Sequence, residues 1–285
     1  MTSDASRTAF VMAGGGSLGA IQVGMLRALL AADVFPDLLI GSSVGALNAG
    51  YFAGAPNAEG VERLAQIWSG LTRADIFPFT LASAFALFRH PDNLVNPDRL
   101  RALIETNLPY DQIEDAVIDI YFVATDQQGR AVRLCRGPAA EAILASAAIP
   151  GVFPPVEIDG EALMDGAVAA SSPIRVAVEL GATRIIVLPT GYACAIKEPP
   201  KGVVARALHA LTLMINWQLM HELEHLPENV QVHLAPTLCP LEISPFDFSA
   251  SQDLIERAAR STRRWIETGG LTRQALPREL AAHRH

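Results

Sequence analysis

Two glycine-rich turns lie 27 positions apart in this chain of 285 residues, and each of them follows a short apolar run. The first turn, residues 14–19 (GGGSLG), follows Ala9–Met12, and the second, residues 41–45 (GSSVG), follows Leu38–Ile40. A helix-like stretch begins directly after each turn. Successive strand–turn–helix units favour a parallel sheet covered by helices, because parallel strands need a crossover connection. The repeated unit therefore predicts an α/β fold.

The rest of the chain continues this alternation of strands and helices. Apolar runs predict strands at 8–12, 37–40, 117–124, 131–135, 156–158, 161–164, 184–188 and 231–234. Periodic stretches predict helices at 17–31, 44–52, 61–71, 139–148, 173–181 and 204–226, one that starts at Asn96-Pro97, and a last one with Ser249 and Gln252 as a capping box. We expect a three-layer α/β/α architecture with a mainly parallel sheet. Since no repeat or linker is visible, we expect one domain over residues 1–285, with the motifs in a core at about 8–190 and a C-terminal completion at about 200–270.

The composition narrows the class of protein. Half of the residues are hydrophobic and 18% are charged, as in a compact and well-buried domain. The formal net charge of −8, without any basic block, argues against nucleic-acid binding. The three scattered cysteines, Cys135, Cys194 and Cys239, form no Cys-x-x-Cys pair and are typical of reduced thiols. No apolar segment of a signal peptide precedes the first strand, so we expect a cytoplasmic protein.

Residues 41–45 have the G-x-S-x-G pattern of a nucleophile elbow. In such a turn a serine is exposed between a strand and a helix, and glycines stand where side chains would clash. Ser43 is therefore a candidate nucleophile, but a serine hydroxyl needs a neighbouring base to take its proton. The same pattern also arises by chance in glycine-rich chains, where it marks only a tightly packed junction of strand and helix.

Residues 14–19 have two interpretations. Consecutive glycines can point several backbone N–H groups into one small space, as an oxyanion hole requires. The spacing G-x-G-x-x-G is also that of a dinucleotide-binding turn, which needs an acidic residue at the end of the second strand. Here the second strand ends in residues 41–43 (GSS), and Asp37 lies before that strand. The sequence therefore favours the oxyanion hole.

A third motif, residues 165–167 (DGA), follows the strand expected at 161–164. A glycine triplet with a fourth glycine three positions on, a G-x-S-x-G turn about 25 residues later and a D-G-A motif more than 100 residues further resemble, in this order, the patatin-like phospholipase family. Residues 146–155 (SAAIPGVFPP) also resemble that family, and the resemblance spans about residues 8–188. The end of the chain, with residues 246–248 (FDF), is similar to the shorter bacterial members.

The resemblance implies a Ser-Asp dyad without a histidine. At the matching positions Ser43 is the nucleophile and Asp165 the base, and the substrate is a fatty-acyl ester such as a phospholipid or lysophospholipid, with no metal or cofactor. A free aspartate has a pKa near 3.9, so Asp165 needs partial burial and a direct hydrogen bond to the serine to act as a base. The implied oxyanion hole is formed by Gly14, Gly15 and Gly16, and the remaining motif glycines are Gly19, Gly41, Gly45 and Gly166.

Two positions depart from the usual pattern of the family. Leu18 stands where a lysine or arginine commonly precedes the last glycine of the first motif, and Ala13 stands where an acidic residue often precedes the triplet. A cation at that place would add charge stabilisation for an oxyanion. The departures motivate a second hypothesis, a lipid-binding protein with weak or lost catalysis. A third is a carboxylesterase or thioesterase that acts on soluble acyl substrates.

Other titratable groups compete with the dyad for a functional role. Residues 221–225 (HELEH) match the H-E-x-x-H pattern of zinc peptidases, with Glu242 as a conceivable third ligand, but Pro227 ends the helix two residues later. We therefore expect a solvated helix end there and no metal site. Asp159 precedes a glycine, and we assign it to a hairpin turn. A histidine that approaches Ser43 in space stays an alternative, and the remaining candidates are His90, His209, His233, His283 and His285.

The segment Asp75–Arg89 contains four phenylalanines among fifteen residues. It has a functional interpretation, a lid or apolar rim that receives acyl chains or contacts a membrane surface peripherally. It also has a structural one, a loop and helix packed on the core, because aromatic side chains gather in cores as well.

Overall fold

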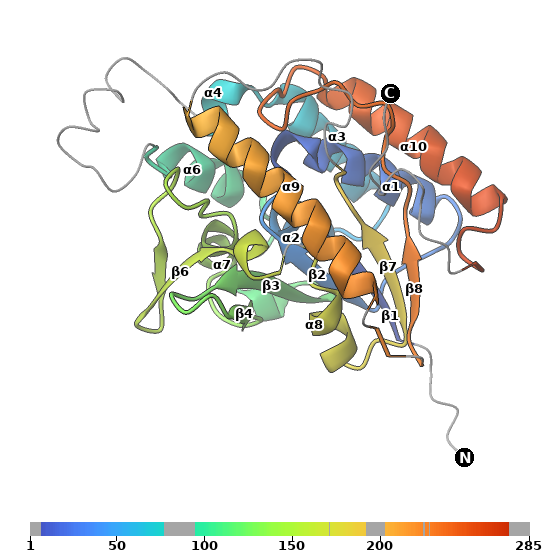
Figure 1. The fold of residues 1–285 in the computed structure, drawn as a ribbon, viewed down its shortest axis with the longest axis horizontal. Coiled ribbons are helices and arrows are strands. Elements are labelled where there is room, and N and C mark those ends of the chain that lie inside the picture. Colours follow the sequence, from blue (N-terminus) through green and yellow to red (C-terminus); the bar gives the residue numbers. More distant parts are fainter. Residues whose placement is uncertain are drawn as a thin grey trace.

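The computed structural model describes residues 7–76, 95–170, 172–191, 203–224, 226–227 and 229–273. Figure 1 shows a central sheet with helices in front of it and behind it. The strands are β1 (Thr8–Met12), β2 (Leu38–Ser42), β3 (Asp119–Thr125), β4 (Ala131–Leu134), β5 (Val156–Ile158), β6 (Glu161–Asp165), β7 (Arg184–Leu188) and β8 (Gln231–Leu234). The α-helices are α1 (Ala20–Leu30), α2 (Val44–Gly54), α3 (Ala58–Gly70), α4 (Arg73–Ile76), α6 (Asp98–Asn107), α7 (Ala139–Ser146), α8 (Ile174–Glu179), α9 (Val203–Glu224) and α10 (Ser251–Glu267). Short 3₁₀ turns are η1 (Gly16–Gly19), η2 (Ile113–Asp115) and η3 (Gly166–Val168).

The order of the strands confirms the mainly parallel sheet expected from the sequence. Among the described residues the order is β5-β6-β3-β2-β1-β7-β8, and β4 pairs with β3 outside this path. Strands β3, β2, β1, β7 and β8 run parallel to one another. At one side of the sheet, β4 and β6 each pair with β3 in antiparallel orientation, and β5 pairs antiparallel with β6.

Apolar side chains of the central strands alternate between two cores, one on each face of the sheet. Phe10 and Met12 of β1 contribute to the core under α1, α2, α3, α7 and α10. Ala9 and Val11 contribute to the opposite core, beneath α8 and α9. This alternation follows from the two-residue period of a strand. In Figure 1, α8 and α9 lie in front of the sheet and α2 lies behind it, so the three-layer α/β/α prediction is confirmed.

The register of the sheet brings the three sequence motifs to one edge. Met12 at the end of β1 pairs with Gly41 near the end of β2, so both glycine-rich turns leave the sheet on the same side. Strand β6 runs opposite to β3 and pairs Asp165 with Ala124, close to the carboxyl end of β3. Because ligand sites of open parallel sheets lie at the carboxyl ends of the strands, this edge is the expected place for a site.

The C-terminal helix α10 completes the core on the side of α1. Leu254, Ile255 and Ala258 of α10 are buried in the same cluster as the α1 side chains. The two helices approach closely at Gly24, where a Cβ atom would lie 2.2 Å from the carbonyl oxygen of Ile255. Glycine is needed at this position because any side chain would displace the α10 backbone.

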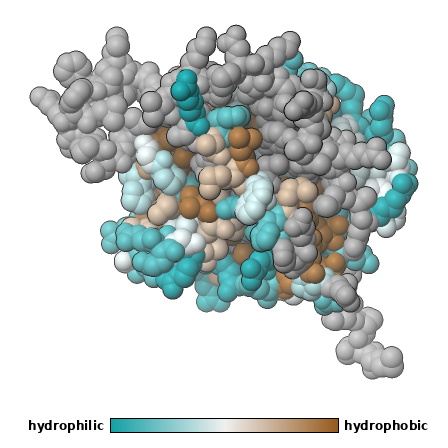
Figure 2. Space-filling view, viewed as in Figure 1, coloured by the Kyte–Doolittle hydropathy of each residue, from teal (hydrophilic) through white to brown (hydrophobic). Residues whose placement is uncertain are grey.

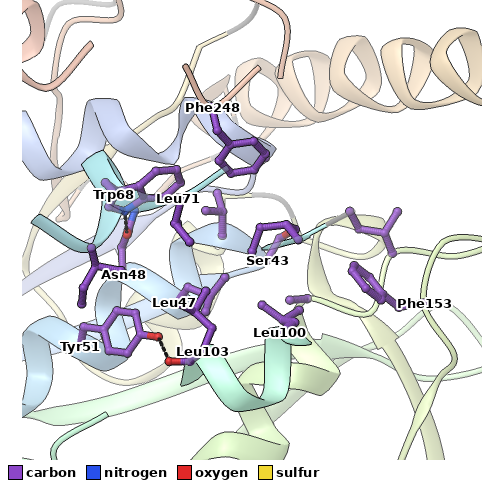
Figure 3. A pocket seen from close by; sticks show the side chains of 16 residues that line it. Ser43, Leu47, Asn48, Tyr51, Trp68, Leu71, Leu100, Leu103, Phe153 and Phe248 are labelled. Atoms are coloured by element: carbon purple, nitrogen blue, oxygen red, sulfur yellow. Dashed lines mark hydrogen bonds between the residues drawn. The ribbon is translucent and has the colours of Figure 1, made fainter. Parts of the chain in front are cut away.

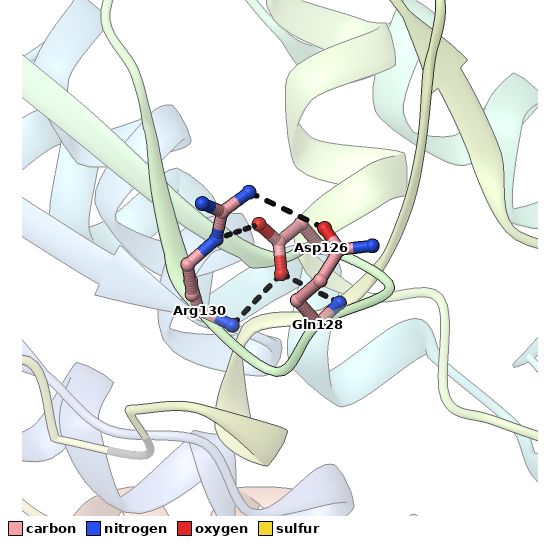
Figure 4. Close-up of polar contacts among 3 residues, drawn as sticks. All are labelled: Asp126, Gln128 and Arg130. Carbon is pink, nitrogen blue, oxygen red and sulfur yellow. Dashed lines mark hydrogen bonds and ion pairs between the residues drawn. The ribbon is translucent and has the colours of Figure 1, made fainter.

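Two hairpins connect the antiparallel strands. The β5–β6 turn contains Asp159 and Gly160 with φ angles of 53° and 79°, as a two-residue hairpin turn requires, so its assignment is confirmed. In the β3–β4 turn, Figure 4 shows the carboxylate of Asp126 accepting hydrogen bonds from the backbone N–H groups of Gln128 and Arg130 and from Nε of Arg130. The backbone N–H of Arg130 and its guanidinium hold the pKa of Asp126 below its usual range.

The last helix begins later than its sequence predicts. Helix α10 starts at Ser251, its N-cap residue is Ala250, and no side chain caps it. The hydroxyl of Ser249 instead donates to Oδ1 of Asp247 at 2.6 Å. The capping-box prediction is therefore wrong, because the serine hydroxyl bonds within the turn that precedes the helix.

The exposed apolar side chains of the described residues include a group on α9. Leu213, Met214 and Trp217 are exposed by 46%, 60% and 68%. Figure 2 shows apolar residues in the middle of the face on which α9 lies, with polar residues along its lower edge. No helix within the described ranges is long and apolar enough to cross a bilayer.

Candidate active site

Ser43 lies in a strained turn between β2 and α2. Its φ and ψ angles are 55° and −126°, in a region that residues with a side chain seldom adopt. Gly41 and Gly45 make the turn possible, because neither position has room for a side chain. A Cβ atom on Gly41 would lie 2.5 Å from the carbonyl oxygen of Gly45, and one on Gly45 would lie 2.1 Å from the carbonyl oxygen of Met12. These are the contacts expected of the glycines in a nucleophile elbow.

A buried serine on α7 supports this turn. The backbone N–H of Ser43 donates to Oγ of Ser146 at 3.0 Å, and the Ser146 hydroxyl donates to the carbonyl oxygen of Val123 at 2.6 Å. Ser146 is fully buried. Its hydrogen bonds fix the strained backbone of Ser43 to the end of β3. In the sequence Ser146 stands only at the start of a stretch that resembles the family, and nothing in the local pattern predicts this contact.

Asp165 at the end of β6 lies directly against Ser43. The Ser43 hydroxyl donates to Oδ2 of Asp165 at 2.7 Å, and the backbone N–H of Ala167 donates to Oδ1 at 2.8 Å. Asp165 is 1% exposed and Ser43 is 7% exposed. Burial raises the pKa of Asp165 from 3.8 to about 6, although both hydrogen bonds act in the opposite direction. The carboxylate is thus a stronger base than an exposed aspartate, and with a pKa of about 6 it is still mainly ionised at neutral pH.

The glycine-rich loop after β1 passes beside Ser43. A Cβ atom on Gly14 would lie 3.2 Å from the Ser43 Cβ, so the two backbones are in close contact. Gly15 has a φ angle of 153°, and a Cβ atom there would lie 2.1 Å from Oγ1 of Thr190. Gly16 has a φ angle of 60° and lines the same pocket as Ser43. Within the described part of the chain, no hydrogen bond is donated by the three amides of this loop, which leaves them available to an oxyanion.

The glycines at the borders of the motifs are required by close packing. A Cβ atom on Gly19 would lie 2.5 Å from Cγ2 of Val44, which holds the start of α1 against the start of α2. A Cβ atom on Gly166 would lie 2.0 Å from the carbonyl oxygen of Val123, beside the end of β3. Each of these contacts keeps the turn around its glycine close to the elbow at Ser43.

Polar side chains hold the glycine-rich loop from behind. Thr190 donates through Oγ1 to the carbonyl oxygen of Gly14 at 2.6 Å. Gln22 donates to the carbonyl oxygen of Ala13 at 2.8 Å, and Asn48 donates to that of Gly19 at 2.9 Å. These side chains are buried, and each gives a carbonyl group of the loop a hydrogen-bond partner. Sequence reasoning missed all three of them, because nothing in the local pattern separates them from other polar residues.

Leu18 packs in the apolar core instead of adding polarity to the site. It is fully buried in the cluster formed with α1, α2 and α3. Ala13 is 2% exposed and lies between β1 and the loop. The two departures from the family pattern therefore leave the backbone amides as the positive groups that the loop presents.

An apolar pocket begins at Ser43. Its wall comes from α2, α3, α4, α6, the segment after α7, and Phe248 before α10. Figure 3 shows side chains such as Leu47, Leu100 and Phe153 around the space next to Ser43. Asn48 also lines the pocket, but its Oδ1 accepts a hydrogen bond from Nε1 of Trp68 at 2.8 Å. With its amide satisfied in this way, the pocket is suited to an alkyl chain.

The competing groups lie elsewhere. His221 stacks on Trp217 at a ring-centroid distance of 5.4 Å, and the carboxylate of Glu222 accepts a hydrogen bond from the backbone N–H of Ile174. Burial raises the pKa of Glu222 to about 7. The described residues contain no group of three potential metal ligands, and His225 lies outside them. The described histidines His209, His221 and His233 do not line the pocket at Ser43.

The phenylalanine-rich segment lies largely outside the described residues. Only Asp75 and Ile76 of the range Asp75–Arg89 are described, as the end of α4. Ile76 lines the pocket that begins at Ser43.

Comparisons with known proteins place the chain in a family. The sequence model of the patatin-like phospholipases matches residues 10–178, more than half of the chain, and the chain therefore belongs to the patatin-like phospholipase family. A patatin-like phospholipase domain-containing protein of Caenorhabditis elegans is 28% identical over 184 residues, which cover 64% of this chain and 16% of the worm protein. The chain thus spans about a sixth of the length of that relative.

A bacterial relative and a solved structure extend this comparison. An uncharacterised protein of the NTE family from Mycobacterium bovis is 30% identical over 173 residues, or 60% of this chain and 46% of that protein. The crystal structure of VipD from Legionella pneumophila matches with a TM-score of 0.50 at 13% identity and covers 92% of this chain and 67% of the other. At this identity the structural match shows a shared fold alone.

Proposed function

We propose that this chain is a serine acyl hydrolase of lipid esters, with Ser43 as the nucleophile and Asp165 as the general base. The observation that carries the proposal is the 2.7 Å hydrogen bond from the Ser43 hydroxyl to the Asp165 carboxylate, at the start of an apolar pocket. A nucleophile next to a base, within hydrogen-bond distance and beside a space for the substrate, is the arrangement that covalent acyl transfer needs.

In the proposed reaction Ser43 Oγ attacks the ester carbonyl while Asp165 accepts the hydroxyl proton. The tetrahedral intermediate collapses, and the alcohol leaves with the proton from Asp165. A water molecule, deprotonated by the same carboxylate, then releases the fatty acid from the acyl-enzyme and restores Ser43. General-base catalysis of this kind contributes about 100- to 10 000-fold to the rate.

The proposed oxyanion hole consists of backbone amides of Gly14, Gly15 and Gly16. Its support is that these amides donate no hydrogen bond within the described residues and that the loop contacts the Ser43 turn. The N-terminus of α2, which begins directly after Ser43, adds a partial positive charge. Loss of one oxyanion donor costs about 100- to 1000-fold in other hydrolases, so these amides supply a large part of the rate.

Phospholipids and lysophospholipids are the proposed substrates. The family and the apolar wall of the pocket support an acyl chain as the part that is recognised. As part of the same proposal, the chain forms one domain, and the segment Asp75–Arg89 contacts the lipid surface peripherally. Its apolar composition supports this contact.

Covalent labelling tests the proposal. A fluorescent fluorophosphonate is incubated with the wild-type protein and with Ser43→Ala, Asp165→Asn and Ser42→Ala. Ser42 is the matched control, because it is the neighbouring serine and its hydroxyl is buried without a hydrogen-bond partner among the described residues. We expect labelling to vanish in Ser43→Ala, to weaken in Asp165→Asn and to persist in Ser42→Ala. Labelling that persists in Ser43→Ala would refute the assignment of the nucleophile.

Two further outcomes distinguish the alternatives. Turnover of short soluble esters without turnover of micellar lysophospholipid would favour a carboxylesterase or thioesterase. A folded wild-type protein that is not labelled but binds lipid vesicles would favour the hypothesis of a lipid-binding protein with weak or lost catalysis, which the absence of a cation at Leu18 motivates.

A further inference from the structure

Helix α2 provides one wall of the pocket, from its first residue to Tyr51. Val44, Leu47 and Tyr51 line the pocket together with Asn48, at the spacing i, i+3, i+4 and i+7 that places side chains on one face of a helix. The stripe starts next to Ser43 and ends at Tyr51. An alkyl chain bound to Ser43 would therefore lie along α2 and reach Tyr51 last.

Tyr51 is the pocket-lining residue of α2 that is furthest from Ser43 along the helix. Its side chain is 8% exposed, and its hydroxyl donates to the carbonyl oxygen of Leu103 on α6 at 3.2 Å. Figure 3 shows Tyr51 bonded to Leu103 at the end of the pocket that lies away from Phe153. Burial raises the pKa of the Tyr51 phenol, so the hydroxyl stays protonated and keeps this hydrogen bond.

A second cavity, of about 360 Å³, also has Tyr51 in its wall. Tyr51 and Ile67 line both spaces, and they therefore form the wall between them. The second cavity is otherwise formed by residues of α3 and by the end of α6 with the segment that follows it, including Arg63, Thr106 and Asn107. Removal of the Tyr51 ring would join this cavity to the acyl pocket.

We infer that Tyr51 is the floor of the acyl pocket and sets the length of the acyl chain that this protein accepts. The inference rests on the proposed function. The eight helical steps from Ser43 to Tyr51 span about 12 Å at the rise of an α-helix, and an extended alkyl chain covers this distance with about nine carbons. The preferred substrates are therefore esters with acyl chains of medium length.

A series of saturated p-nitrophenyl esters, from four to sixteen carbons, measures this length. Each methylene that enters an apolar pocket raises kcat/KM about fourfold. For the wild-type protein we expect this rise to continue to about nine carbons and then to stop. The rate of labelling of Ser43 by n-alkyl fluorophosphonates should break at the same length, and this second measurement needs no variant.

Three variants assign the break to Tyr51. In Tyr51→Ala the rise should continue by about four more carbons, so that at about fourfold per methylene the ratio of kcat/KM for sixteen and eight carbons increases about 250-fold. Tyr51→Phe keeps the ring and should leave this ratio within twofold. Tyr110→Ala is the matched control, because Tyr110 also bonds to α2, through the carbonyl oxygen of Gly50 at 2.9 Å, but lines neither cavity.

The outcomes separate this inference from the function on which it rests. If no ester is hydrolysed and no phosphonate labels Ser43, the proposed function fails. If Ser43 is labelled but the wild-type series shows no break at medium length, or if folded Tyr51→Ala keeps the wild-type break, the inference fails and the hydrolase proposal stands. If Tyr51→Ala does not fold, Tyr51→Leu, which also removes the ring, takes its place, and the wild-type series alone still decides the length.

Discussion

Replacement of Asp165 by asparagine should stabilise the folded protein at neutral pH while it removes activity. Burial raises the pKa of Asp165 from 3.8 to about 6, and this difference of about two pKa units corresponds to about 3 kcal/mol. The folded state binds the proton of Asp165 more tightly than the unfolded state does, so protonation of Asp165 stabilises the folded protein. This stabilisation is fully present below the unfolded pKa and is lost as the pH rises through about 6. Asparagine has nearly the same shape as aspartate and carries no charge, so the stability of the variant does not fall as the pH rises through this range.

Urea unfolding of the two proteins between about pH 4 and about pH 8 measures this effect. The free energy of unfolding of Asp165→Asn minus that of the wild type should be near zero at the acid end and should reach about 3 kcal/mol at the alkaline end. For a chain of this size the midpoint of thermal unfolding should rise by about 5 °C at neutral pH.

Asp126→Asn provides a control of opposite sign. The backbone N–H of Arg130 lowers the pKa of Asp126, so its stabilising contribution is present above the unfolded pKa and is lost as the pH falls through the folded pKa. This variant should therefore be less stable than the wild type at neutral pH. If folded Asp165→Asn is no more stable than the wild type at pH 8, the ionised carboxylate is not destabilised by burial, and the reasoning for Asp165 is refuted.

Two further predictions concern activity. Since Asp165 accepts a proton only when it is ionised, kcat/KM should rise with pH through a midpoint at about 6, and a midpoint near the 3.8 of an ordinary aspartate would contradict the effect of burial. Gly15→Ala, whose Cβ atom would lie 2.1 Å from Oγ1 of Thr190, should displace the loop and lower kcat by about 100-fold or more. Gly70→Ala, whose Cβ would meet no other described residue outside its own helix within 4 Å, should change kcat by less than about twofold. Similar losses in both glycine variants would argue against the oxyanion loop.

The sequence predicts the parts of this fold that depend on local pattern. Short apolar runs located the strands, and the second glycine-rich turn placed Ser43 correctly between β2 and α2. The sequence does not show that β6 runs antiparallel to β3, although this pairing brings Asp165 to Ser43. That contact spans 122 positions and depends on the tertiary arrangement of several elements. The family resemblance, not periodicity, pointed to Asp165, and the catalytic roles of both residues stay predictions.

The supporting polar residues could not be found in the sequence. Gln22 and Asn48 lie on helices among apolar neighbours, and each could equally have faced solvent. In the structure the side-chain oxygen of Gln22 accepts a hydrogen bond from Asn48 at 2.7 Å, and both side chains bond to backbone carbonyls around the glycine-rich loop. Because a buried amide must have its partners, these two residues fix the loop in one conformation. The capping box at Ser249 failed for the related reason that a serine hydroxyl has several local acceptors.

In the proposed mechanism one carboxylate serves without the histidine of a triad. In a Ser-His-Asp site the third residue orients the base. Here the backbone N–H of Ala167 occupies Oδ1 of Asp165 and leaves Oδ2 for Ser43, so the main chain performs this orientation. The burial that raises the pKa of Asp165 makes it a stronger base and, by the same change, makes the folded state less stable at neutral pH. Basicity and instability at this position therefore have one cause, and a substitution that lowers the pKa of Asp165 by exposing it to water should gain stability and lose rate together.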